Sequence, residues 1–175
     1  PSGAVMIDGG YGAVREVPAR GLSAWLVTDL RAELIADVRR AARGVGLVPE
    51  VSSYAVDDLV VEPRPLVHTS HPTWGYLMHW AGRTAVWAPE FWQFPSWAFA
   101  TDLMFADAAG WSRPIRFRGG VGGHAGVLDT AEQARRAGVR RLVFAHIGRP
   151  TIRAIDAGKL PPFGEIGREG ADYYL

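Results

Sequence analysis

Short apolar runs alternate with turn residues along most of the chain. Each run has the length of a buried strand, and glycine, proline or a polar cluster closes most of them. The pattern predicts strands over these ranges: 4–8, 23–28, 58–62, 65–69, 75–80, 83–89, 101–108 and 140–147, with a last strand in the tail at 171–175.

Three segments are predicted to be helical. Apolar residues recur at helical spacing from Leu30 to Ala42, Asp29 stands in an N-cap position and Gly44 follows, so a helix is expected over 29–43. The other two helices are expected over 124–139, after a glycine-rich loop at 118–123, and over 150–158, where proline stands in the first turn.

Helices that follow strands along the chain indicate a layered α/β sandwich in one domain, residues 1–175. The strand-rich middle argues against a purely parallel, doubly wound sheet.

The composition narrows the chemistry. The 175 residues contain no cysteine, which excludes disulfides, thiolate zinc sites and cysteine nucleophiles. No apolar run approaches the ~20 residues of a membrane span, and the start shows no signal-peptide pattern, so we expect a cytoplasmic protein. The net charge of +1 points to no polyanionic partner, although nucleic acid is not excluded.

Histidines stand at informative places. His68 and His146 end predicted strands, His124 opens a predicted helix and His71 precedes a proline. Strand ends converge at one edge of a sheet, so these imidazoles, the usual neutral nitrogen ligands of zinc, are candidates for one site. His79 alternates with apolar neighbours on a strand and is interpreted as structural.

Three stretches resemble the C-terminal half of metallo-β-lactamase-fold hydrolases. They are GYLMHWAGRTAVWAPE, ATDLMFADAAGW and GGHAGVLDTAEQARRAGVRRLVFAHIGRP. The closest likeness is to the branch that holds tRNA 3′-processing ribonucleases and phosphonate-pathway phosphodiesterases, and it runs from about residue 58 to 158. The resemblance implies an αββα sandwich that hydrolyses a phosphodiester or related ester with metal-bound hydroxide.

The resemblance also implies roles for particular residues. His68 and His146 would bind zinc or another divalent metal, and Glu90 would bridge two ions. His124 would act on the leaving group or hold the scissile phosphate. Gly122 and Gly123 would present backbone N–H groups to an anion.

The chain departs from the family's H-x-H-x-D-H motif. Without a gap, Asp29, Arg31, Glu33 and Leu34 occupy its four positions. A guanidinium is always protonated and cannot bind a metal, and leucine offers no donor, so only Asp29 retains a ligating group near the start of the motif.

Three hypotheses follow. One is a metallohydrolase with an altered, mononuclear site on His68, Glu90 and His146, with Asp29 or Asp107. Another is a relative that has lost the metal and binds an anionic ligand through Arg31. The third is a structural or interaction domain.

Two further expectations concern the surroundings of the site. The aromatic segment 91–111 is expected to be core or lid, or else the contact of a homo-oligomer. The chain opens on AVMIDGG, which resembles a later strand of the family, so the first β-hairpin is expected to be lacking.

Overall fold

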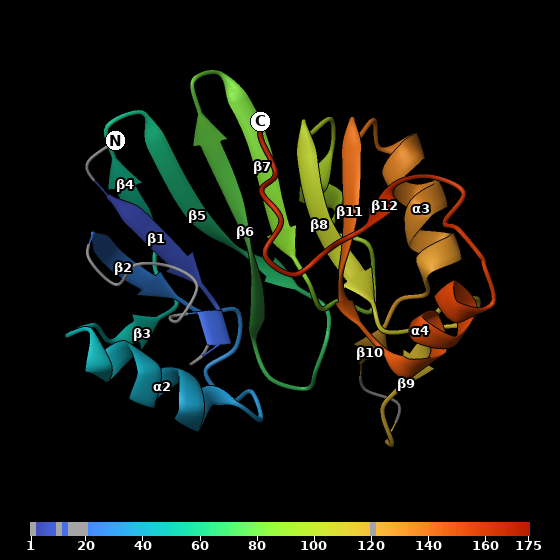
Figure 1. The fold of residues 1–175 in the computed structure, drawn as a ribbon, viewed down its shortest axis with the longest axis horizontal. Helices are drawn as coiled ribbons and strands as arrows, with labels where there is room; N and C mark the ends of the chain where they lie inside the picture. Colours follow the sequence, from blue (N-terminus) through green and yellow to red (C-terminus); the bar gives the residue numbers. More distant parts are fainter. Residues whose placement is uncertain (1–2, 10–11, 14–20, 120–121) are drawn as a thin grey trace.

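A computed structural model describes residues 3–9, 12–13, 21–119 and 122–175. Gly10 of the first predicted turn, and Gly120 and Val121 of the glycine-rich loop, lie outside the described residues. Two sheets, packed face to face, form the centre of the molecule (Figure 1).

The larger sheet has seven strands in the order β12-β11-β8-β7-β6-β5-β4. Strands β4 to β7 pair antiparallel, whereas β7, β8, β11 and β12 run parallel, so the sheet is mixed as the strand-rich middle predicted. Its strands are β4 (Tyr54–Val56), β5 (Leu59–Leu66), β6 (Thr73–Trp80), β7 (Arg83–Ala88), β8 (Leu103–Ala108), β11 (Arg141–Ile147) and β12 (Glu165–Ile166).

The smaller sheet consists of β1 (Ala4–Ile7), β2 (Leu22–Leu26) and β3 (Pro49–Glu50), all parallel. Successive side chains at β2 point to opposite faces of the small sheet, so one face packs on a helix and the other on the large sheet. Trp25 and Val27 pack against Ala41 and Ala42 of helix α2 (Ile35–Gly44), whereas Leu26 packs on the large sheet.

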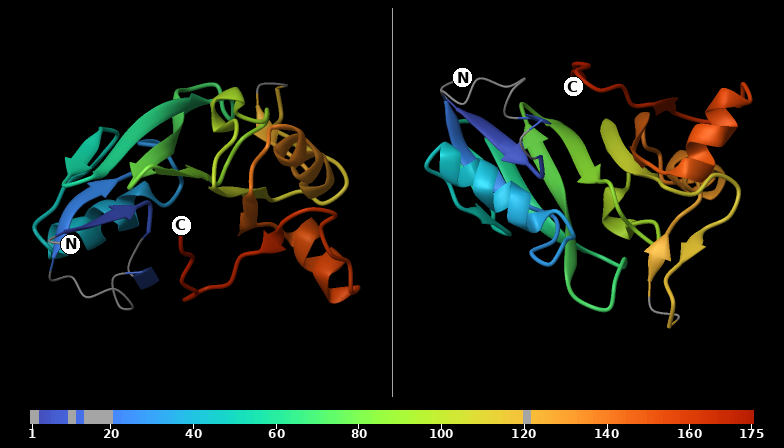
Figure 2. Two further views of the ribbon diagram at one scale, coloured as in Figure 1. Left: turned by 90° about the horizontal axis from the view of Figure 1, so that it is seen from above. Right: turned by 60° about the horizontal axis from the view of Figure 1, so that its bottom comes forward.

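Helices α3 (Val127–Arg136) and α4 (Arg149–Asp156) cover the opposite face of the large sheet. Val127 and Ala131 of α3 and Ala154 of α4 belong to one buried cluster with Phe144 of β11 and Met104 of β8. Helix, small sheet, large sheet and helices therefore form the expected αββα sandwich (Figure 2).

Short elements complete the chain. The pair β9 (Ile115–Arg116) and β10 (Gly123–His124) forms a small antiparallel ribbon, and a 3-10 turn covers Ser96–Ala98. In the described ranges, no helix is both long and apolar enough to cross a bilayer.

Several predicted boundaries are wrong. The first helix begins at Ile35 rather than at Asp29, and its N-cap residue is Leu34. The carboxylate of Asp29 accepts hydrogen bonds from the Arg31 amide and from His71, and residues 29–34 form turns. The second helix begins after His124, which lies in β10, and the tail at 171–175 is not a strand.

The two strands predicted over 58–62 and 65–69 are one strand, β5, which continues through Pro63 and Pro65. Beyond Val61, no described strand pairs with β5 on the side of β4. Proline has no amide hydrogen to give to a ladder, so a stretch of strand that is unpaired on one side tolerates it. The carbonyl of Pro65 instead accepts the Trp97 indole N–H at 3.0 Å.

The aromatic segment 91–111 is mostly core. Phe91 and Trp111 are buried in the main cluster and Trp97 packs against it, while Phe99 is exposed. A homo-oligomer contact through this segment stays a prediction.

Tyr76 connects the two sheets. Its side chain is fully buried and its hydroxyl donates to the Val27 carbonyl at 2.8 Å, while burial raises its pKa far above the ordinary value. Tyr76→Phe is expected to lower the free energy of unfolding by about 1–2 kcal/mol, because a buried carbonyl loses its donor. Urea unfolding measures the change. Tyr174→Phe, at an exposed tyrosine, is the control, and equal effects of both would contradict a role for this bond.

Candidate functional site

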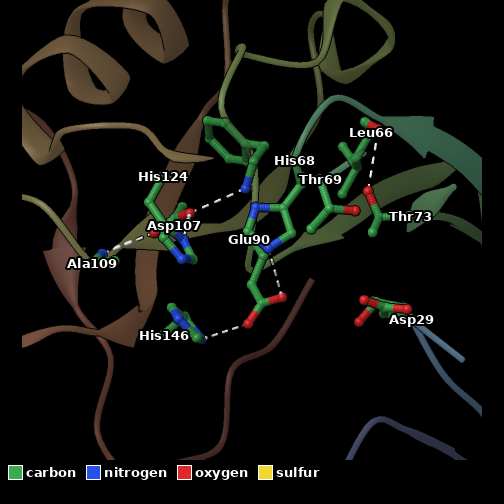
Figure 3. Close-up of polar contacts among 12 residues, drawn as sticks. Asp29, Leu66, His68, Thr69, Thr73, Glu90, Asp107, Ala109, His124 and His146 are labelled. Atoms are coloured by element: carbon green, nitrogen blue, oxygen red, sulfur yellow. Dashed lines mark hydrogen bonds and ion pairs between the residues drawn. The ribbon is translucent and has the colours of Figure 1, made fainter. Parts of the chain in front are cut away.

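Chemistry-bearing side chains gather at the carboxyl ends of the parallel strands. Glu90 follows β7, Asp107 lies near the end of β8 and His146 near the end of β11 (Figure 3). Because neighbouring parallel strands end at the same edge, these residues meet although they are distant in sequence. The loop after β5 adds His68 and the strand β10 adds His124.

Glu90 is the centre of this cluster. One carboxylate oxygen lies 3.3 Å from Nε2 of His68, and the other lies 3.0 Å from Nδ1 of His146. The side chain of Glu90 is 28% exposed, that of His68 6% and that of His146 41%, so the cluster opens to solvent on the His146 side. The predicted convergence of His68, Glu90 and His146 is thus present in the described geometry.

The loop at Gly122 and Gly123 fixes His68. The Gly123 carbonyl lies 2.8 Å from Nδ1 of His68, and the Gly123 amide donates to the His68 carbonyl at 2.8 Å. A Cβ at Gly122 would come within 1.8 Å of the His68 carbonyl oxygen, and the φ of +78° there also favours glycine. These two glycines, predicted to contact an anion, lie against the backbone of a site histidine.

Asp107 orients His124. Its carboxylate is fully buried and lies 2.7 Å from Nδ1 of His124, and it accepts the amides of Phe91 at 3.0 Å and Ala109 at 2.8 Å. The His124 ring stacks on the His146 ring, with centroids 5.0 Å apart and planes at 13°. The Asp107 carboxylate leaves Nε2 of His124 as the ring nitrogen available for chemistry.

His146 lies at an irregularity in β11. The register with β8 shifts between Ala145 and Ile147, and His146 has a φ of +48°. Left-handed backbone is unusual for a non-glycine residue and gathers at functional sites, where the surrounding structure enforces it. The shift turns the imidazole toward Glu90, and no local sequence signal reveals it.

The N-terminal half of the predicted site is arranged differently. Asp29 pairs with Nε2 of His71 at 2.9 Å and lies apart from Glu90 (Figure 3). Arg31, Glu33 and Leu34 are exposed. Arg31 lines a small cavity of about 190 Å³ with Asp29 and His71. The pairing of His71 with Asp29, 42 positions away in the sequence, is a contact that the sequence analysis did not predict.

Asp8 accepts hydrogen bonds from residues of both sheet layers next to the site. Its carboxylate accepts the Thr28 amide at 2.8 Å, the Thr28 hydroxyl at 3.0 Å and the Trp87 indole N–H at 2.8 Å. Burial raises the pKa of Asp8, the hydrogen bonds oppose that rise, and the negative charge of Glu90 adds to it. The sequence showed Asp8 at a strand end but not these partners.

The charges of the cluster are mutually dependent. Burial would raise the pKa of Glu90, but the hydrogen bond with His68 and the charges of the three histidines outweigh burial and lower it. Burial would lower the pKa of His68, but Glu90, the Gly123 carbonyl and Asp107 outweigh burial and raise it. The pair therefore favours a carboxylate beside an imidazolium.

The donor set was compared with what a metal ion requires. Two imidazoles and one carboxylate are the protein ligands of many mononuclear catalytic zinc sites. Arg31 and Leu34, which the sequence analysis aligned with two ligand positions of the family's dinuclear centre, offer no donor to a metal. Across the described residues, no group of three or more histidine, aspartate or glutamate side chains is already arranged to enclose an ion. Glu90, which gives one oxygen to each histidine, would have to turn to complete a three-ligand set.

Comparisons with known proteins identify the fold. A scan against models of protein families and a search of curated proteins find no match. Comparison with solved structures shows that the chain has the metallo-β-lactamase fold.

Three solved structures illustrate the likeness. The metallo-β-lactamase fold protein YhfI from Bacillus subtilis matches with a TM-score of 0.71 and 14% identity, over 97% of this chain and 86% of YhfI. Zn²⁺-bound PqqB from Methylobacterium extorquens matches with a TM-score of 0.68 and 12% identity, over 99% of this chain and 84% of PqqB. A diphosphatase of the PhnP family matches with a TM-score of 0.63 and 16% identity, over 98% and 80%.

The Glu90–His68 pair predicts a pH-dependent stability in metal-free protein. The pKa of Glu90 lies below 4.5 and that of His68 above 6.5, so both are charged between these values. The stabilisation is lost as the pH falls through the lowered pKa of Glu90, or rises through the raised pKa of His68. Glu90→Gln should therefore destabilise by about 1–3 kcal/mol near pH 5.5, and by less above pH 8.

Thermal unfolding in EDTA across this pH range measures the difference. Glu132→Gln, which removes an exposed partner of Arg135 and Arg136, is the matched control and should show no such window. A Glu90→Gln effect that is constant from pH 5 to pH 9 would contradict the charged pair.

Proposed function

We propose that the protein is a hydrolase of phosphodiesters or related esters, with one metal position at His68, Glu90 and His146 in place of a dinuclear centre. The observation that carries the proposal is the contact of one carboxylate with both imidazoles, at 3.3 and 3.0 Å. The fold supports it, since Zn²⁺-bound PqqB and the diphosphatase of the PhnP family share that fold.

The chemical character of the cluster also favours a cation. With neutral imidazoles, Glu90 and Asp107 leave the cluster with two negative charges, and a divalent ion would replace the protons that otherwise hold the histidines against the carboxylates. The Gly123 carbonyl already orients the His68 ring, as carbonyls commonly do for histidines that bind metals. When bound, such an ion supplies an activated water and stabilises the negative charge of the transition state.

The reaction would add water across a P–O bond. The oxygen of water bonds to phosphorus and gives up one proton to the solvent, the ester P–O bond breaks, and the leaving oxygen takes a proton. Nε2 of His124 is placed to donate that proton, because Asp107 holds Nδ1 and stabilises the imidazolium. Arg31 is exposed and lies outside the cluster, and its predicted contact with substrate stays a prediction.

A second candidate function is metal-free binding of an anionic ligand. The specific observation in its favour is that Arg31 lines the cavity of about 190 Å³ where the family's motif would place ligating histidines. Asp29 is hydrogen-bonded there to Nε2 of His71, and the Arg31 guanidinium forms no ion pair with the other residues that line that cavity.

Metal content tests the first proposal. Purified protein equilibrated with zinc or manganese and then dialysed is expected to retain about one equivalent, measured by elemental analysis. His68→Ala and His146→Ala should weaken retention at least ~10-fold, because each removes a ligand. The same substitutions, or EDTA, should abolish hydrolysis of bis(p-nitrophenyl) phosphate.

His79→Ala is the control, because His79 is exposed on β6. Equal metal content in all variants, or no retained metal in the parent protein, would overturn the mononuclear site.

Arg31→Ala tests the second candidate. If Arg31 binds an anion, this substitution should weaken binding of inorganic phosphate ~5–10-fold in calorimetry, corresponding to the loss of one charge-assisted contact. Arg39→Ala, at an exposed arginine of α2, should leave phosphate affinity unchanged. Indifference to Arg31→Ala would remove the anion site.

A further inference from the structure

A cavity of about 470 Å³ opens beside the cluster, on the face of the large sheet that is opposite α3 and α4. Trp87 of β7, Phe105 of β8 and Val143 of β11 form its floor, and Ala145 and Ile147 lie beside them. The volume is in the range of small-molecule sites, which are mostly apolar with a few polar groups at one end.

The outer wall is the C-terminal segment 167–175, which crosses in front of β8 and β11 (Figure 1). Gly167 donates its amide to the Phe144 carbonyl at 2.9 Å. Tyr173 anchors the rest: its ring meets Phe105 edge-on at 5.3 Å and lies 5.1 Å from the Arg141 guanidinium, and its hydroxyl accepts the Arg168 amide at 3.0 Å.

The cavity and the cluster share His146. Its imidazole lies against Glu90, and the residue is also among those that line the cavity, together with its two chain neighbours. Trp87 also connects the cavity with the surroundings of the cluster. It is part of the cavity floor, and its indole N–H donates a hydrogen bond to the carboxylate of Asp8. A molecule in the cavity would therefore place one end next to the cluster.

We infer that this cavity binds the apolar part of the substrate, a group of about the size of a naphthyl or nitrophenyl ring, while the ester bond lies at His146. This inference rests on the proposed hydrolase function and names its substrate class: diesters with at least one bulky apolar substituent. Arg168 and Glu169 at the rim carry opposite charges, so together they favour neither a positive nor a negative substituent on the substrate.

Kinetics with two diesters test the substrate class. Bis(p-nitrophenyl) phosphate and methyl p-nitrophenyl phosphate share a leaving group and differ in the second substituent. The parent protein should prefer the first by ~10-fold or more in kcat/KM after correction for the intrinsic reactivity of the two diesters. Ala171→Trp, which fills the cavity from its exposed wall, and Tyr173→Ala, which releases that wall, should remove most of this preference.

Tyr174→Ala is the matched control, since this neighbouring tyrosine is 78% exposed and is not part of the cavity. It should keep the preference. Circular dichroism melts establish that each variant is folded. If Tyr173→Ala does not fold, Ala171→Trp alone tests whether the preference depends on the cavity.

Binding of 2-naphthol, followed by ligand-observed NMR and calorimetry, separates the cavity from catalysis. The parent protein should bind it with a dissociation constant of roughly 1 mM or tighter, and Ala171→Trp should weaken binding ~10-fold. Naphthol binding with this mutational pattern but no hydrolysis of either diester would overturn the proposed function and leave the cavity as a ligand site. Hydrolysis without preference and without naphthol binding would overturn the cavity inference alone.

Discussion

The half-buried carboxylate of Asp8 is the contact on which the arrangement of the site depends. It receives Thr28 from the end of the small sheet and Trp87 from the large sheet, so one side chain fixes the position of the two layers. Glu90 follows Trp87 by three residues, and its placement therefore depends on the same contact. Loss of these hydrogen bonds would leave a carboxylate without partners between two apolar faces, a state that folded proteins avoid.

The two halves of the site differ in the side chains that they bring together. The half built on parallel strand ends keeps three imidazoles and two carboxylates in contact, whereas the half built on the turn at 29–34 presents no imidazole to them. In that turn, the carboxylate of Asp29 lies 2.9 Å from Nε2 of His71. The chain thus combines a cluster suited to chemistry with a neighbouring segment in which Asp29 is hydrogen-bonded to His71.

Much of the fold followed from local patterns, because apolar runs of strand length are closed by glycine or proline. The meeting of His68, Glu90 and His146 was also predictable, since parallel strands end at a common edge. The start of α2 was not, because the partner that holds Asp29 in a turn lies 42 residues away. Nor was the left-handed backbone at His146, which arises from a register shift between β8 and β11 that only the assembled sheet imposes.

The two prolines of β5 have a consequence for how the molecule meets copies of itself. A sheet margin with free amides is a template on which a second chain can add a strand. Pro63 and Pro65 occupy the stretch of β5 that extends past β4, and neither has an amide hydrogen to offer. An added strand therefore finds no amide donor at Pro63 and Pro65, which disfavours edge-to-edge growth along this stretch of β5.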